Sequence, residues 1–495
     1  MPTPPVLLIH GYSAESPETA AASIAGIYGN LPARLRAAYG AASVFELDVS
    51  RYVTLDDGLT VDDLAFALDR ALRAEHQSLL DTGFRVIIHS TGALVIRDWL
   101  RRFSPRYVNK PLQRVIYLAG ALFGSGWAHI GKGQLAKWAR MVFQGGAERG
   151  IQVLDALEFG ASWTIDLHTY FLEEGHALLD DYGVREAAVI GSEPHQSWFP
   201  IPIRYAKEDG SDGVIRVPAG NPNFSYVQIG ATDAARNTAW QVVCGAVASH
   251  QQGPLIGDIG TFYELKGHRT PGDKGHPISP MAVALRRAHT GETGIVQDVT
   301  DQVLDLVRTS LDATDAEWGS VQTAFTAATD TTYAAAAQRN TAPIPIRWID
   351  DSRAQYDRHA QVVFRIRDQD GRPVEHCDIY FNNVDGVRTD AVPFNSLLED
   401  KHVNEVSPNC ICFYLRATKW NGTTEWVSQV AAVGNCFLEV TAVEPETDAI
   451  QYLPLRVALP TGDLVRWIAP HATTIVDVEL LRLPAPELFI IQPVL

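Results

Sequence analysis

Short runs of apolar residues alternate with helix-like stretches through about the first 312 residues. The apolar runs lie at residues 6–9, 43–49, 85–89 and 115–119. The segments 61–78 and 93–103 between them have apolar residues at helical spacing, which predicts amphipathic helices. Strands that alternate with helices in this way are joined by right-handed crossovers and form a parallel sheet covered on both faces. We therefore predict a doubly wound, mostly parallel α/β sheet.

The pattern changes after this region. A Thr/Ala-rich stretch, residues 323–341, leads into Pro343-Ile344-Pro345, which we interpret as a linker after a last helix. From about residue 346 onward, short runs of β-branched and aromatic residues are separated by turn signals such as Asn421-Gly422. This pattern is typical of an antiparallel β-sandwich of immunoglobulin-like type. We predict an α/β domain over residues 1–340 and an all-β domain over residues 341–495.

Residues 124–198 fit neither pattern. Leu135 and Trp138 belong to a set of apolar residues at helical spacing, which predicts an amphipathic helix. One interpretation is a helix packed on the core. The other is a helical cap whose apolar face binds a lipid-like substrate, with Leu135 and Trp138 as substrate-binding residues. The position of the segment just after a strand favours the cap.

The segment 85–97 consists of an apolar strand, a tight turn through Ser90 and a helical run. A serine at such a strand-to-helix turn projects above the sheet, over a helix N-terminus whose free amides favour negative charge. Gly92 allows the close packing that the turn requires. The alternative is that Ser90 only caps the helix.

The first apolar run supplies a second part of this constellation, because it ends in Ile9-His10-Gly11-Tyr12. The glycine lets the chain bend so that a backbone N–H can point toward the serine. We predict that the amides of Tyr12 and Thr91 form the two halves of an oxyanion hole. His10 and His89 adjoin these motifs and are interpreted as structural.

Candidate acids and bases follow the serine along the chain. Asp212 lies in a loop after an apolar segment, with Asp209 as a rival acid. His289 lies between a candidate last strand and a candidate last helix, and His268 and His250 are rival bases. Nucleophile, acid and base thus occur in the order Ser, Asp, His.

Together these motifs resemble those of α/β-hydrolases of the lipase and esterase kind. The matching segments are Leu8-Ile9-His10-Gly11-Tyr12, His89-Ser90-Thr91-Gly92, Ser211-Asp212-Gly213-Val214 and His289-Thr290-Gly291. The resemblance covers about residues 5–312, and residues 124–135 also resemble the cap entrance of bacterial lipase-like members. One position departs from the family pattern, because Ile88 stands two residues before the serine, where a small residue is usual.

The resemblance implies a mechanism and favours one candidate for each role. Ser90 would attack an ester carbonyl, His289 would accept its proton and return it to the leaving alcohol, and Asp212 would orient the imidazole. Asp212 is preferred over Asp209 because Asp-Gly followed by an apolar pair is the usual family context. His289 is preferred because His-Thr-Gly is similar to the His-Ser-Gly of relatives.

The leading hypothesis is a serine hydrolase of carboxylic esters, with no cofactor and no metal. Acyl glycerols or phospholipids are expected substrates because of the apolar cap. Two alternatives stay open: an acyltransferase with the same triad, and a non-catalytic binding protein on the same scaffold. The partner of the C-terminal domain is unknown from the sequence.

Composition and charge limit the class of protein and the partners that it could bind. With 46% hydrophobic and 20% charged residues the chain is typical of a soluble globular protein. The net charge of -17 argues against binding to nucleic acid, while peripheral contact with a lipid surface through a local patch stays open. No signal peptide or membrane helix is visible, so the default expectation is a cytoplasmic protein, with export by another route left open.

The chain contains five cysteines. Cys410-Ile411-Cys412 is too closely spaced for the usual metal-binding pair. We expect plain strand residues there, or a disulfide to Cys377 or Cys436.

Overall fold

The computed structural model describes residues 5–10, 20–52, 58–125, 151–193, 208–237, 262–341, 354–383 and 392–484. The chain divides into two compact units. The first consists of Met1–Phe224, Pro271–His359 and Lys419–Val427. The second consists of Ser225–Thr270, Ala360–Thr418 and Ser428–Leu495. Each unit is therefore assembled from three separate stretches of the chain.

This division differs from a single boundary at residue 340. Ser225–Thr270, expected in the first domain, supplies two strands to a sheet of the second unit. In the other direction, residues 341–359 and 419–427 belong to the first unit. A strand pattern reveals that a segment is extended but not which partner it pairs with, and here the partner lies more than 200 residues away along the chain.

The first unit is built on a six-stranded sheet in the order β2-β1-β3-β4-β5-β8. Its strands are β1 (Val6–His10), β2 (Val44–Asp48), β3 (Phe84–His89), β4 (Leu112–Leu118), β5 (Arg185–Gly191) and β8 (Met281–Ala284). All five strand pairings in this sheet are parallel. The predicted parallel α/β sheet is confirmed.

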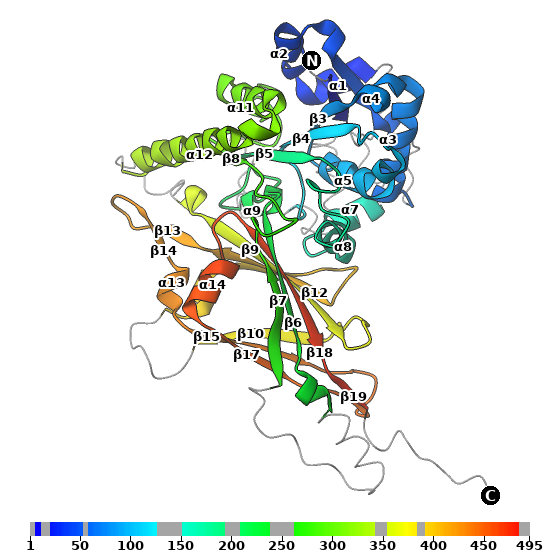
Figure 1. The fold of residues 1–495 in the computed structure, drawn as a ribbon. Coiled ribbons are helices and arrows are strands. Elements are labelled where there is room, and N and C mark those ends of the chain that lie inside the picture. The colour runs from blue at the N-terminus through cyan, green and yellow to red at the C-terminus, as the bar shows by residue number, and fades with distance from the viewer. Residues whose placement is uncertain are drawn as a thin grey trace, which may run out of the picture. The chain divides into compact units, whose positions relative to one another are not determined.

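Helices cover this sheet on both faces (Figure 1). They are α1 (Ala20–Tyr28), α2 (Leu31–Tyr39), α3 (Val61–Glu75), α4 (Gln77–Thr82), α5 (Gly92–Arg102), α7 (Ile151–Leu157), α8 (Ser162–Tyr170), α9 (Val217–Gly220), α11 (Asp301–Asp312) and α12 (Trp318–Thr341). Residues of α1, α2, α11 and α12 share one apolar cluster with alternate residues of the central strands, such as Leu8, Ile87 and Ile116. The intervening strand residues face the opposite side, where α3 and α5 pack together.

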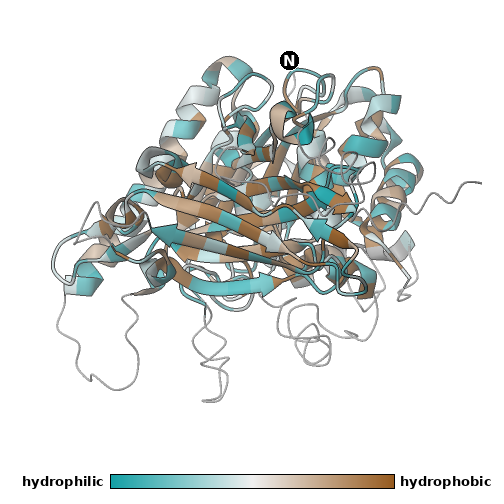
Figure 2. Cartoon of the chain, turned by 90° about the horizontal axis from the view of Figure 1, so that it is seen from below, coloured by the Kyte–Doolittle hydropathy of each residue, from teal (hydrophilic) through white to brown (hydrophobic). Residues whose placement is uncertain are grey.

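The Thr/Ala-rich stretch before the predicted linker is helical. It forms most of α12, whose Val321 and Phe325 are fully buried in the same apolar cluster. Alanine has the highest helix propensity, and the threonines are accommodated by bonding back to the helix, as Thr326 does through its hydroxyl to the carbonyl of Gln322. In Figure 2 the helices show teal and brown patches side by side, as expected for elements with one buried face.

The second unit contains two larger sheets, in the orders β11-β12-β9-β18-β6-β7 and β10-β15-β17. Their strands are β6 (Phe224–Ala231), β7 (Tyr263–Arg269), β9 (His359–Asp368), β10 (Cys377–Asn383), β11 (Leu398–Val403), β12 (Cys410–Arg416), β15 (Cys436–Ala442), β17 (Leu455–Leu459) and β18 (Thr473–Leu480). The remaining strands and helices of this unit are β16 (Ile450–Tyr452), β19 (Arg482–Pro484), α13 (Val430–Val433) and α14 (Thr461–Trp467). The short strands β13 (Thr418–Trp420) and β14 (Trp426–Ser428) lie mostly within Lys419–Val427, which belongs to the first unit.

Side chains from both sheets meet in one apolar cluster. Phe364 of β9 contacts Phe381 of β10 and Phe413 of β12, with ring centroids 5.9 and 5.6 Å apart. The β10-β15-β17 sheet is antiparallel as predicted. The expectation of a wholly antiparallel domain is wrong for β9 and β18, which pair in parallel over eight residues. An alternation of apolar and polar residues is compatible with a strand of either direction, so the sequence pattern could not reveal the parallel pairing.

The four cysteines of the described residues all lie in strands. Cys410 and Cys412 are buried in β12, while Cys377 and Cys436 are free thiols, so neither of these bridges to that pair. Burial raises the pKa of the Cys377 thiol to about 11 and that of Cys436 to about 12. None of the helices in the described part of the chain is long and apolar enough to cross a membrane.

Candidate active site

Ser90 occupies the sharp turn between β3 and α5. Its φ angle is +54°, in the left-handed region that residues with a side chain rarely adopt. The Ser90 carbonyl accepts hydrogen bonds from the amides of Ala93 and Ala121, at 3.1 and 3.0 Å, which fixes this conformation. The tight strand-to-helix turn predicted at the serine is therefore present, and α5 begins two residues later.

The bulky residue before the serine is accommodated by the glycine after it. A Cβ atom placed on Gly92 would lie 2.4 Å from Cγ1 of Ile88 and 2.7 Å from its Cδ1. Ile88 thus fills the space that a side chain at position 92 would need. The departure from the family pattern leaves the turn intact because these two positions compensate for each other.

Three residues distant in sequence meet at this turn. The Nε2 atom of His289 lies 3.0 Å from Oγ of Ser90, and its Nδ1 atom lies 3.0 Å from Oδ2 of Asp212. His289 and Asp212 are each 1% exposed, and Ser90 is 7% exposed. The sequence separations of the two pairs are 199 and 77 residues. The hydrogen bonds therefore run in one series from carboxylate to imidazole to hydroxyl.

The other carboxylate oxygen of Asp212 accepts hydrogen bonds within the turn that contains this residue. Oδ1 accepts hydrogen bonds from the amides of Val214 and Ile215, at 2.9 and 2.7 Å. Gly213, between Asp212 and Val214, has a φ of +95°, which favours glycine. The amide of His289 donates to the Asp212 carbonyl at 3.2 Å. Oδ1 thus fixes the carboxylate while Oδ2 faces the imidazole.

The other sequence candidates fall elsewhere. His289 contacts Asp212, the preferred of the two acids. His268 lies on β7 in the second unit. His250, Tyr12, Leu135 and Trp138 lie outside the described residues, as do residues 126–150 and 194–198 of the predicted cap. The rest of the predicted cap is described, and its residues 185–191 form β5 of the central sheet, so the cap bounds of 124–198 are wrong for this strand.

Thr91, the other predicted oxyanion donor, directly follows the serine and is 2% exposed. It stands at the N-cap of α5. Among the described residues, no acceptor is in hydrogen-bond geometry with its amide.

Solved structures with the same architecture identify the fold. No protein-family model matches the chain, and no curated protein matches it. Phospholipase PlaB from Legionella pneumophila matches with a TM-score of 0.73 and 22% sequence identity, over 99% of this chain and 96% of that chain. The chain has the α/β-hydrolase fold.

Two further structures match. The same phospholipase in complex with thio-NAD gives a TM-score of 0.73 and 21% identity, with the same coverage. The mature lipase BlEst2 from Bacillus licheniformis has 15% identity and covers 44% of this chain and 80% of that chain, but its TM-score of 0.31 is too low to carry an argument.

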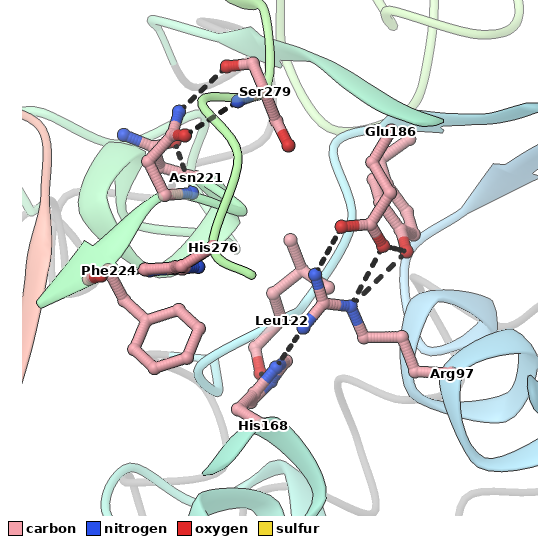
Figure 3. Close-up of polar contacts among 10 residues, drawn as sticks. Arg97, Leu122, His168, Glu186, Asn221, Phe224, His276 and Ser279 are labelled. Carbon is pink, nitrogen blue, oxygen red and sulfur yellow. Dashed lines mark hydrogen bonds and ion pairs between the residues drawn. The ribbon is translucent and has the colours of Figure 1, made fainter. Parts of the chain in front are cut away.

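A buried ionic network joins α5 to β5 (Figure 3). Arg97 of α5 donates from Nε to Oε1 of Glu186 at 3.0 Å, and a second bond joins its Nη2 to Oε2. The Tyr117 hydroxyl also donates to Glu186. Breaking such a buried pair by removing one partner typically costs about 3–5 kcal/mol. This network could not be predicted from the sequence, because an arginine on an amphipathic helix usually faces solvent.

The same arginine fixes the protonation state of His168. Arg97 donates from Nη1 to Nδ1 of His168, so this nitrogen is the acceptor and Nε2 carries the proton. Nε2 donates to the carbonyl of Leu122. Burial and the nearby Arg97 charge hold the pKa of His168 well below its ordinary value, so the ring is neutral.

The segment that contains Leu122 contacts both the serine turn and the aspartate turn. The Ala121 amide donates to the Ser90 carbonyl, and the Ser125 hydroxyl donates to the Val214 carbonyl at 2.8 Å. Through Leu122, the Arg97 network is therefore connected both to the serine turn and to the aspartate turn.

His89 packs against His289. Its ring centroid is 4.5 Å from that of His289, and its Nε2 lies 3.3 Å from the His289 carbonyl. The structural role expected for His89 agrees with these contacts. Among the described residues, no group of three or more His, Cys, Asp or Glu side chains could hold a metal ion.

The compensation between Ile88 and Gly92 can be tested by stability measurements. We expect Gly92→Ala to lower the free energy of unfolding by about 1–3 kcal/mol, because the added methyl overlaps Ile88. In the Ile88→Ala background the same change should cost much less, since the space is then open. Urea denaturation of the four proteins measures this coupling. Additive costs of the two substitutions would contradict the explanation.

The neutral His168 predicts a pH dependence of stability. Its pKa in the folded protein lies below the ordinary 6.5, so its contribution is complete above pH 6.5 and is lost as pH falls. The loss is at most about 1.4 kcal/mol per pH unit. We expect His168→Gln, which keeps a donor and an acceptor but cannot titrate, to flatten this slope between pH 7 and 5. A slope unchanged in His168→Gln would contradict a neutral His168.

Proposed function

We propose that this α/β-hydrolase is a serine hydrolase that cleaves carboxylic esters. The single observation that supports this most directly is the hydrogen-bonded series Asp212–His289–Ser90 at a strained strand-to-helix turn. The α/β-hydrolase fold is the setting in which this arrangement recurs.

The proposed reaction follows from the direction of the hydrogen bonds. Asp212 Oδ2 accepts from Nδ1–H of His289, which leaves the lone pair of Nε2 facing the Ser90 hydroxyl. Ser90 Oγ attacks the ester carbonyl while His289 takes its proton, and the buried carboxylate stabilises the imidazolium. His289 then protonates the leaving alcohol, giving an acyl-enzyme. Water attacks the acyl-enzyme by the same route and regenerates Ser90.

Negative charge on the tetrahedral intermediate is stabilised by backbone amides in this proposal. The Thr91 amide at the start of α5 is one donor, and the positive end of the helix dipole adds to it. The second donor is the Tyr12 amide, which lies outside the described residues. No cofactor or metal enters the proposed steps.

The proposed substrates are esters of long-chain acids, such as acyl glycerols or phospholipids. The protein of known structure that matches over nearly the whole chain is named a phospholipase, which favours this class. Of the alternatives, the contacts of Ser90 argue against a non-catalytic scaffold, because a binding protein needs no base within 3.0 Å of the hydroxyl. Acyl transfer would use the same groups, with an alcohol in place of water.

The test is hydrolysis of a short p-nitrophenyl ester by triad variants. We expect Ser90→Ala and His289→Ala each to lower kcat by roughly 10⁴-fold, and the double variant to be little worse than either. His268→Ala is the matched control and should retain activity. Hydrolysis by Ser90→Ala within tenfold of the wild type would contradict the proposed function.

A further inference from the structure

A short segment beyond the predicted domain boundary contacts the aspartate turn. Residues Ala354–Tyr356 form a single 3-10 turn and belong to the first unit. Gln355 is 2% exposed, and its Nε2 donates to the carbonyls of Ser211 and Ser192, at 3.1 and 2.8 Å. Its own carbonyl accepts from the amide of Gly210 at 3.1 Å. One residue therefore bonds to both positions that immediately precede Asp212.

The two carbonyls that Gln355 joins belong to elements in close contact. Ser192 directly follows β5, and its amide donates to the carbonyl of Arg287 at 2.9 Å, in the loop that leads to His289. A Cβ atom on Gly191 would lie 2.8 Å from Cβ of Asp212. The end of β5 thus packs against the aspartate itself, and Gln355 connects this strand end to the aspartate turn.

The neighbouring Tyr356 extends these contacts to the histidine loop. Its hydroxyl lies 3.0 Å from Oγ of Ser192, donates to Glu193 at 2.7 Å and accepts from the amide of Arg286 at 3.3 Å. Arg339 of α12 forms an ion pair with the same Glu193. The Ala354–Tyr356 segment therefore bonds to the turn that bears the acid and to the loop that bears the base.

The chemistry of the Gln355 side-chain amide indicates which end of it makes these contacts. Both groups facing its nitrogen are carbonyl oxygens, so only the NH₂ end can point toward them. Its Oε1 is buried with no hydrogen-bond partner among the described residues. An unpaired buried carbonyl costs about 1–3 kcal/mol. An apolar side chain of the same size would avoid that cost, but it would lose the two donated hydrogen bonds.

We propose that Gln355 is a positioning residue, which acts on the reaction by holding the Gly210–Asp212 turn so that the Asp212 carboxylate meets His289. This inference rests on the proposed function. It places a residue needed for full activity beyond the predicted linker, outside the stretch that carries every triad residue.

The test is Gln355→Met, which keeps the volume and removes both donors. We expect kcat on the p-nitrophenyl ester to fall by about 10- to 100-fold, with KM within about twofold of the wild type. Because Gln355 acts through Asp212, the same substitution in the Asp212→Asn background should change kcat by less than twofold. Thr332→Val is the matched control: it removes a buried hydrogen bond from α12 to the Val283 carbonyl and should leave kcat unchanged.

The outcomes separate the inference from the function on which it rests. Ser90-dependent hydrolysis with an unchanged kcat in Gln355→Met would overturn the inference and leave the function standing. An equal loss of kcat in the Asp212→Asn background would also overturn it, because Gln355 would then be merely structural. Hydrolysis that does not depend on Ser90 would instead contradict the proposed function.

If Gln355→Met does not fold, Tyr356→Phe takes its place, since it removes only a hydroxyl from the same segment. We expect a smaller loss of kcat, about 3- to 10-fold, that also disappears in the Asp212→Asn background. A wild-type kcat in Tyr356→Phe would then overturn the inference.

Discussion

The buried imidazole of His289 is the constraint on which the rest of the site depends. It has to meet a carboxylate on one side and a hydroxyl on the other, at 3.0 Å each, and the three groups come from three separate loops. Each loop is accordingly held by contacts of its own. The serine turn is held by the Ala121 amide, and the aspartate turn by bonds to Oδ1 and by Gln355. The histidine loop is held through Ser192 and Tyr356.

The buried ion pair of Arg97 and Glu186 helps to hold these loops in position. Arg97 and Glu186 satisfy each other, and the arginine also fixes the tautomer of His168, which holds the Leu122 carbonyl. A buried ion pair adds little net stability compared with apolar packing, but it is directional, so its value here is in fixing positions. The segment that it holds touches the serine turn and the aspartate turn, which makes the network part of the scaffold for the site.

Much of the site could be predicted from the sequence because its chemistry is local. The strand–Ser90–helix pattern and the Asp212-Gly213 turn are short motifs whose backbone requirements are visible in a few neighbouring residues. The family resemblance then selected Asp212 over Asp209 and His289 over His268. The compensation between Ile88 and Gly92 could not be predicted, because it depends on which way one side chain packs.

Long-range partners account for what the sequence did not reveal. Arg97, His168 and Gln355 carry no motif, and their roles depend on partners between 46 and 163 residues away. The same limit explains the domain boundary. The sequence of β6 is that of an ordinary strand, and nothing within it indicates that its partner, β18, lies beyond residue 340. The parallel sheet was predictable because its strands and helices alternate in order along the chain.

The most direct test of the central claim is to label the protein with a fluorophosphonate and locate the adduct by peptide mass spectrometry. Only a serine activated by an adjacent base reacts rapidly with such a reagent. The geometry predicts a single phosphonyl adduct on the peptide that contains Ser90, formed by the folded protein and lost in His289→Ala. An adduct on another serine, or equally fast labelling of Ser90 in His289→Ala, would contradict a triad centred on His289.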